Sequence, residues 1–119
     1  MDINIRRING KAIAEVVSDT IIVFETEDAL DIMANASYMG SGKIILYERN
    51  INPEFFDLKT GLAGEILQKF STYGVSLAII GDFDTYSSKS LNDFIRESNR
   101  YGHVNFTATL DDAIKALAK

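Results

Sequence analysis

The apolar positions of the chain change their spacing after residue 17. In residues 2–17 they alternate with polar ones around Asn9-Gly10, the dipeptide favoured in a two-residue type I′ turn because both central residues need positive φ. Such a turn would pair Ile8 with Lys11 and fix the register of a hairpin. We predict that one hairpin face, expected to be buried, carries Ile3, Ile5, Ala14 and Val16, and that the other carries Asn4, Arg6, Ile13 and Glu15, with Arg6 able to meet Glu15 diagonally.

Beyond residue 20, apolar runs and helical stripes follow one another. The runs at 43–48 and 75–80 are typical of strands covered on both faces, and 103–106 is a shorter candidate, while 21–24 is too short to classify. Between and after them, apolar residues recur with the helical period of 3.6. We predict four helices. The first has Thr26 as its N-cap and ends near Tyr38, and the third is capped by Ser87 or Ser88 and ended by Gly102. The second, central helix has an apolar stripe of Leu62, Ile66, Leu67, Phe70 and Tyr73, and the last is capped by Thr109, with Ala113, Ile114 and Leu117 facing inward.

The order of these elements predicts the fold class. A hairpin followed by alternating strands and helices indicates an α/β domain whose mixed sheet begins antiparallel and continues through parallel βα units. With 119 residues and no linker or repeat, the chain is expected to form a single domain over residues 1–119.

Composition excludes several classes of function. The net charge of −5 disfavours a nucleic-acid binder, which needs a face rich in Lys and Arg. No cysteine and a single histidine, His103, leave no thiol chemistry and make a His-based metal site improbable. We therefore expect no metal or cofactor. The amino terminus lacks a signal-peptide pattern and no apolar run approaches the ~20 residues of a membrane span, so we expect a cytoplasmic protein without membrane contact.

The segment leading into the central helix carries a resemblance to a known family. Leu58-Lys59-Thr60-Gly61-Leu62-Ala63, placed after a hairpin and a βα unit, resembles the loop of the STAS domain (sulphate transporter and anti-sigma factor antagonist), which there reads Asp-Ser-Ser-Gly-Leu-Gly. The closing helix at 109–117 is also similar. The amino-acid sequence of residues 55–69, together with those of 88–91 and 94–99, resembles that of a small bacterial family of unknown function, whose domain covers the whole chain. This second resemblance implies no activity.

The STAS resemblance implies a non-enzymatic regulatory module that binds a protein. In antagonists of that family a partner kinase phosphorylates the serine before the glycine, and the matching position here is Thr60. Lys and Thr replace the paired serines, and the acidic residue, Asp57, lies further away than in the family. The candidate binding and switch residues are thus Asp57, Lys59, Thr60 and Gly61, with a kinase or regulator as partner and a homodimer possible. The alternative is that Asp57 or Thr60 simply caps the central helix.

A second loop supports a different class of function. Asp82-Phe83-Asp84-Thr85 follows an apolar strand and resembles the Asp-x-Asp-x-Thr loop of HAD-type phosphatases, in which the first Asp is a nucleophile and the second an acid/base. Ser88, at the start of the next helix, is a further candidate. The alternative function is a small enzyme or an anion- or metabolite-binding domain that uses the 82–84 and 57–61 loops, since open α/β sheets bind ligands at strand ends.

Overall fold

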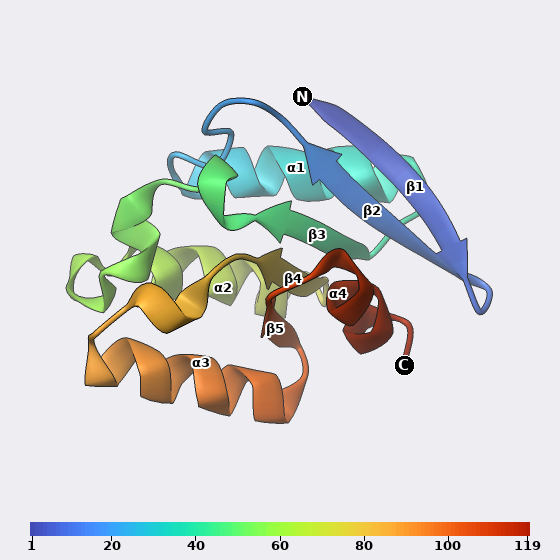
Figure 1. Ribbon diagram of the computed structural model, residues 1–119. Coiled ribbons are helices and arrows are strands. Elements are labelled where there is room, and N and C mark those ends of the chain that lie inside the picture. The colour runs from blue at the N-terminus through green and yellow to red at the C-terminus, as the bar shows by residue number, and fades with distance from the viewer.

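The computed structural model describes residues 1–119 as five strands and four α-helices (Figure 1). Short 3-10 turns fill the connections that follow β3 and β4. The elements in chain order are β1 (Asp2–Ile8), β2 (Lys11–Val17), α1 (Thr26–Tyr38), β3 (Lys43–Tyr47), α2 (Leu62–Thr72), β4 (Ser76–Ile80), α3 (Lys89–Tyr101), β5 (Val104–Thr107) and α4 (Leu110–Leu117).

The hairpin has the turn and register expected from Asn9-Gly10. Both residues adopt positive φ, 53° and 77°, as a type I′ turn requires. Ile8 pairs with Lys11, and the pairing continues without a bulge to Asp2 opposite Val17. The hairpin prediction is therefore confirmed residue by residue.

The remaining strands add in parallel, in the order β1-β2-β3-β4-β5. A helix lies in the chain between each of these parallel pairs, because a parallel partner can be reached only by a crossover connection. The predicted fold class, an α/β domain whose mixed sheet starts with an antiparallel hairpin, is confirmed.

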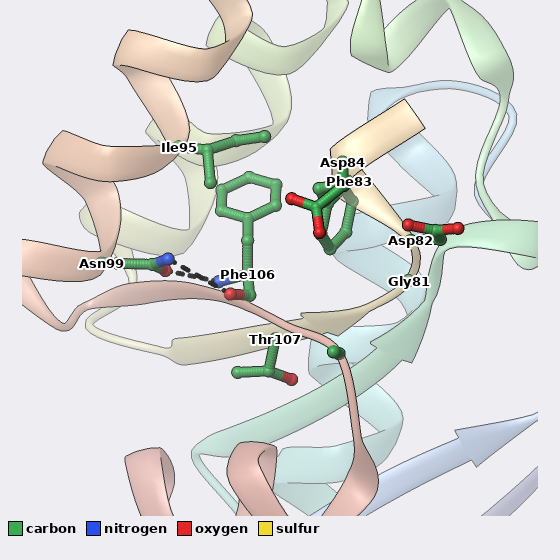
Figure 2. Close-up of a pocket in the computed structure, with 9 residues that line it drawn as sticks. Gly81, Asp82, Phe83, Asp84, Ile95, Asn99, Phe106 and Thr107 are labelled. Carbon is green, nitrogen blue, oxygen red and sulfur yellow. Dashed lines mark hydrogen bonds between the residues drawn. The ribbon is translucent and has the colours of Figure 1, made fainter. Parts of the chain in front are cut away.

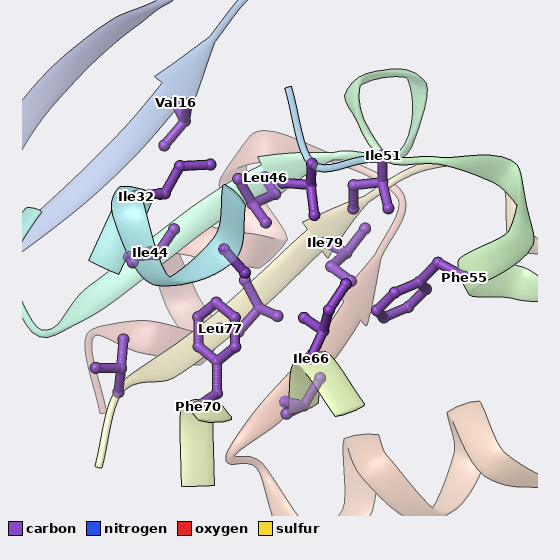
Figure 3. Packing of buried hydrophobic residues seen from close by; sticks show 14 of the residues in the cluster. Val16, Ile32, Ile44, Leu46, Ile51, Phe55, Ile66, Phe70, Leu77 and Ile79 are labelled. Carbon is purple, nitrogen blue, oxygen red and sulfur yellow. The ribbon is translucent and has the colours of Figure 1, made fainter. Parts of the chain in front are cut away.

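The helices cover the two faces of the sheet unequally. Helices α1, α2 and α3 pack on one face over the larger core cluster, and α4 packs alone on the other. The alternation of side chains along β3 and β4 divides the core between the faces. Ile44, Leu46, Leu77 and Ile79 point to the large cluster (Figure 3). Ile45, Ala78 and Ile80 point to α4. The face under β1 and β2 that α4 does not reach is where polar side chains gather.

Several predicted boundaries were wrong by a residue or two. The N-cap of α1 is Glu25 and not Thr26, because Glu25 forms a capping box with Asp28. Strand β3 ends at Tyr47, and Glu48 already belongs to a 3-10 turn. At the other ends, β4 begins at Ser76 and β5 spans 104–107.

The packing corrects one further expectation and decides between the two forms, a strand or a docked extended segment, that were open for residues 21–24. Tyr73 was predicted in the buried stripe of α2, but its ring is 64% exposed because the helix ends at Thr72. The unclassified segment 21–24 is an extended stretch docked on the segment after β3, with Val23 bridged to Ile51.

Candidate functional site

The segment between β3 and α2 lies at the carboxyl end of the parallel strands and is anchored to the core by its buried side chains. Its 3-10 turns span Glu48–Asn50, Pro53–Phe56 and Leu58–Thr60. Phe55 and Phe56 are buried, only 2% and 6% exposed, and the buried Asn52 donates to Phe24 O and accepts from Glu54 N. A loop fixed in this way presents Asp57 and residues 59–61 to solvent, while Leu58 is half-buried against the core.

Thr60 is exposed, and its hydroxyl group closes the end of this loop. Its Oγ1 lies 2.8 Å from Glu54 O and 2.9 Å from Asp57 O, which share its single proton, and it accepts from Leu62 N at 3.2 Å. The next residue, Gly61, has φ 79° and forms the N-cap of α2 without a side-chain bond. The hydroxyl of Thr60 therefore ties two carbonyl groups of the loop to the first turn of the helix.

The other candidate residues of this loop are also exposed. Asp57 caps the last 3-10 turn through Oδ1, which accepts from Lys59 N at 3.3 Å. Asp57 does not cap α2, so of the two capping assignments only Thr60 touches that helix. The Lys59 side chain extends from the same turn and makes no ion pair.

The Asp82 loop lies beside the first loop because aromatic rings join them. Phe56 stacks on Tyr86 with ring centroids 5.6 Å apart and lies 5.9 Å from the ring of Phe83. Ser88 follows and caps α3, its Oγ accepting from Leu91 N at 3.2 Å. The two candidate loops are thus packed against each other through these rings.

A cavity of about 440 Å³ opens beside Asp82 and Asp84 (Figure 2). No Lys or Arg lines it, so it does not suit an anion. Its one amide side chain, Asn99, is already used: Asn99 Nδ2 donates to Phe106 O, and Asn99 Oδ1 accepts from Phe106 N. No group of three or more His, Asp or Glu side chains in the molecule is close enough to hold a metal ion.

The Glu48 side chain connects the two loops. The sequence pattern did not identify it as a site residue, because it counted Glu48 within the strand. From the end of β3 its Oε1 accepts from Asp82 N at 3.0 Å, and its Oε2 accepts from the hydroxyl of Tyr86. Partial burial and the bond to this carboxylate raise the pKa of Tyr86. The signal that could have identified Glu48 is its position, since it is an acidic residue directly after a buried strand.

A second polar cluster lies on the sheet face that α4 leaves open. Glu15 accepts from Arg6 Nη2 at 2.8 Å and from the Tyr47 hydroxyl at 2.6 Å, and its side chain is 7% exposed. Burial alone would raise the pKa of Glu15, but the hydrogen bonds from Tyr47 and Arg6 outweigh it and hold that pKa below its ordinary value. The diagonal Arg6–Glu15 pair was predicted; Tyr47 was not.

Comparisons with known proteins identify the family of this chain and a solved structure of similar fold. A family model described as "Domain of unknown function (DUF4180)" matches residues 8–117. The chain belongs to the DUF4180 family. No curated protein matches this DUF4180 chain. A solved structure that it resembles is a candidate anti-sigma factor antagonist from Thermotoga maritima, with a TM-score of 0.50 and 13% identity over 98% of this chain and 95% of that one.

At that identity the likeness concerns the fold alone. This DUF4180 protein has a STAS-like fold, as the resemblance in its sequence implied. None of its helices has the length and apolar character that crossing a membrane requires.

Proposed function

We propose that this DUF4180 protein is a protein-binding regulatory module, and that its docking surface is the loop 52–61 together with residues 82–88. The observation that carries the proposal is the exposed hydroxyl of Thr60, which holds the loop closed through Glu54 O and Asp57 O. A STAS-like fold resembling an anti-sigma factor antagonist supports a protein as the partner.

Phosphorylation of Thr60 would act on both bonds at once. Its Oγ1 would become an ester oxygen, which has no proton to donate, so Glu54 O and Asp57 O would lose the Thr60 hydroxyl and keep only their backbone donors, Asp57 N and Thr60 N. The phosphate adds about −1.5 to −2 charge at the start of α2, where the helix N-terminus and Lys59 favour it while Asp57 repels it. The loop would therefore change shape and charge together, and binding would change with it.

A loop surface without a cluster of basic residues fits a protein better than a small anion. Lys59 is the only basic side chain in residues 52–61 and lies on the same loop as the acidic residues Asp57 and Glu54. The aromatic contacts of Phe56 keep both loops in place beneath the surface, which limits the entropy that docking would cost.

A site-specific crosslinking experiment tests the proposal. A photoreactive amino acid at Lys59 in the full chain, expressed in its native host, should capture a defined protein, whereas the same group at Lys115 on α4 should not. Thr60→Glu should change the yield of that adduct at least about fivefold, and Thr60→Ser should retain it. Phosphopeptide mass spectrometry on the same preparations should detect phosphate on Thr60. Equal capture from both positions, or capture indifferent to Thr60→Glu, would overturn the proposal.

A further inference from the structure

The two edge strands of the sheet, β5 and β1, differ in whether their outward backbone groups have hydrogen-bond partners. At the β5 edge, the side chain of Asn99 occupies both the N–H and the C=O of Phe106 (Figure 2). At the other edge, β1 runs for seven residues with β2 as its only strand partner, and neither a proline nor a bulge interrupts it. An edge left open in this way is a template for another strand.

The hairpin register determines which groups of β1 point outward. A two-residue turn closes on a hydrogen-bonded pair, here Ile8 with Lys11, and hydrogen-bonded and non-bonded pairs then alternate along the ladder. Arg7, Ile5 and Ile3 therefore direct their N–H and C=O groups away from β2. Three donors and three acceptors are aligned along this free edge.

We propose that β1 pairs antiparallel with β1 of a second copy of this chain, with Asn4 opposite Asn4 at the twofold axis. In this register Asp2 lies opposite Arg6 of the second copy, and Ile3 lies opposite Ile5. The outward groups of Ile3 and Ile5 then form the hydrogen-bonded pairs, as the alternation requires.

Neighbouring registers lose this complementarity. Centring the pair on Ile5 places Asp2 opposite Ile8, and Arg6 opposite Asn4, so no opposite charges meet. Centring it on Ile3 places Asp2 opposite Asn4 and leaves Arg6 beyond the end of the second strand. A shift by a single residue would pair side chains from opposite faces of the sheet, which a twofold pair cannot do.

The structure leaves Arg6 able to accept this second carboxylate. Its Nε and Nη2 both donate to the same oxygen, Oε1 of Glu15, at 3.0 and 2.8 Å, so Nη1 is free, and its side chain is 41% exposed. Asp2 is exposed and has no side-chain bond within its own chain. Pairing Asp2 with Arg6 therefore displaces no existing contact.

Apolar side chains exposed at the start of β1 favour the same contact. Met1, Tyr38 and Met39 are 59%, 93% and 41% exposed and line a shallow cavity of about 430 Å³ with Ile3. The second copy would bring the apolar stem of its Arg7 opposite Met1. Both the charged face and the apolar face of the edge thus match a second copy better than an arbitrary strand.

A cysteine at the twofold axis tests the register directly, because the chain contains no cysteine of its own. In a non-bonded antiparallel pair the two Cα atoms at position 4 would be about 4.5 Å apart, within the range that a disulfide spans. Asn4→Cys should therefore form a covalent dimer under mild oxidation. Arg7→Cys is the matched control, since its two copies would be about 20 Å apart along the strands, and it should stay monomeric.

Sedimentation of the unmodified chain completes the test. We expect a concentration-dependent dimer, and we expect Asp2→Arg, which sets like charges opposite each other twice, to raise the dissociation constant about tenfold or more. A wild-type monomer at all concentrations up to about millimolar, where even weak association is detected, or equal crosslinking of Asn4→Cys and Arg7→Cys, would overturn the proposal. Neither result bears on the 52–61 loop, so this test and that of the proposed function can fail separately.

Discussion

Gly81 lies against the side chain of Glu48 so closely that a Cβ on Gly81 would be 2.7 Å from the Cβ of Glu48. The glycine is thus the condition for the Glu48 side chain to cross from the end of β3 to Asp82 N and Tyr86. This contact joins the two loops of the proposed docking surface.

Gly81→Ala should lower the free energy of unfolding by about 1–3 kcal/mol, because the added methyl group must displace Glu48. Chemical denaturation measures the change. Gly64→Ala is the matched control: Gly64 lies on an exposed part of α2, where an added Cβ would meet no atom within 4 Å, and alanine there should raise stability by about 0.5–1 kcal/mol. Equal effects of the two substitutions would show that Glu48 is not confined as described.

Glu15→Gln should lower the free energy of unfolding by about 1–3 kcal/mol near neutral pH, because a nearly buried acceptor of charge-assisted bonds is lost. The pKa of Glu15 is lowered in the folded protein, so its contribution is complete above the unfolded value of 4.5 and disappears as pH falls through the folded pKa.

Urea denaturation at several pH values measures this dependence. The gap between wild type and Glu15→Gln should be widest at neutral pH and should narrow below pH 4.5. Glu54→Gln, on an exposed residue without a side-chain bond, is the control and should change little. A gap independent of pH would rule out the carboxylate as its source.

Tyr47→Phe should remove part of the decline in stability at alkaline pH; the part due to Tyr86, whose pKa is also raised, should remain. Partial burial and the bond to Glu15 raise the pKa of Tyr47 to about 12 from its ordinary 10.0. The raised pKa stabilises the fold fully below pH 10, and this contribution is lost as pH rises toward 12. Wild type should therefore lose stability over that window relative to Tyr47→Phe. Tyr38→Phe, on a ring that is 93% exposed, should behave as wild type.

Thr60→Val should lower stability by about 1 kcal/mol and loosen the loop, since it removes the hydroxyl that joins Glu54 O, Asp57 O and Leu62 N. Hydrogen exchange should become faster in residues 54–62 and stay unchanged in β3 and β4. Thr72→Val, at the exposed far end of α2, supplies the control. Unchanged exchange in Thr60→Val would mean that the hydroxyl does not hold the loop.

Local patterns were sufficient to predict the elements and their order. Asn9-Gly10 determines both the turn and its register because few residues adopt positive φ, and the apolar runs of β3 and β4 indicate burial on both faces. The position of the 52–61 loop followed from the same reasoning, since a loop after a parallel strand must lie at the carboxyl edge of the sheet. The burial of Asn52, Phe55 and Phe56 within this loop did not follow from it.

Long-range contacts were not predictable from such patterns. The bond from Tyr47 to Glu15 joins residues 32 apart in the chain, and that from Tyr86 to Glu48 joins residues 38 apart. Both depend on which strands become neighbours. Helix caps also misled: Thr26 is a favourable N-cap by type, but the paired bonds of Glu25 and Asp28 place the start of α1 one residue earlier.

The side chain of Asn99 also limits how large an assembly can become. A sheet with both edges open can grow from copy to copy without end, as in fibres. Here Asn99 occupies the N–H and C=O of Phe106 at the β5 edge, so strand addition is favoured at β1 over β5, and the proposed twofold pair would consume the β1 edge in both copies. One asparagine would thereby work against linear polymerisation, at a position outside the loops that form the proposed docking surface.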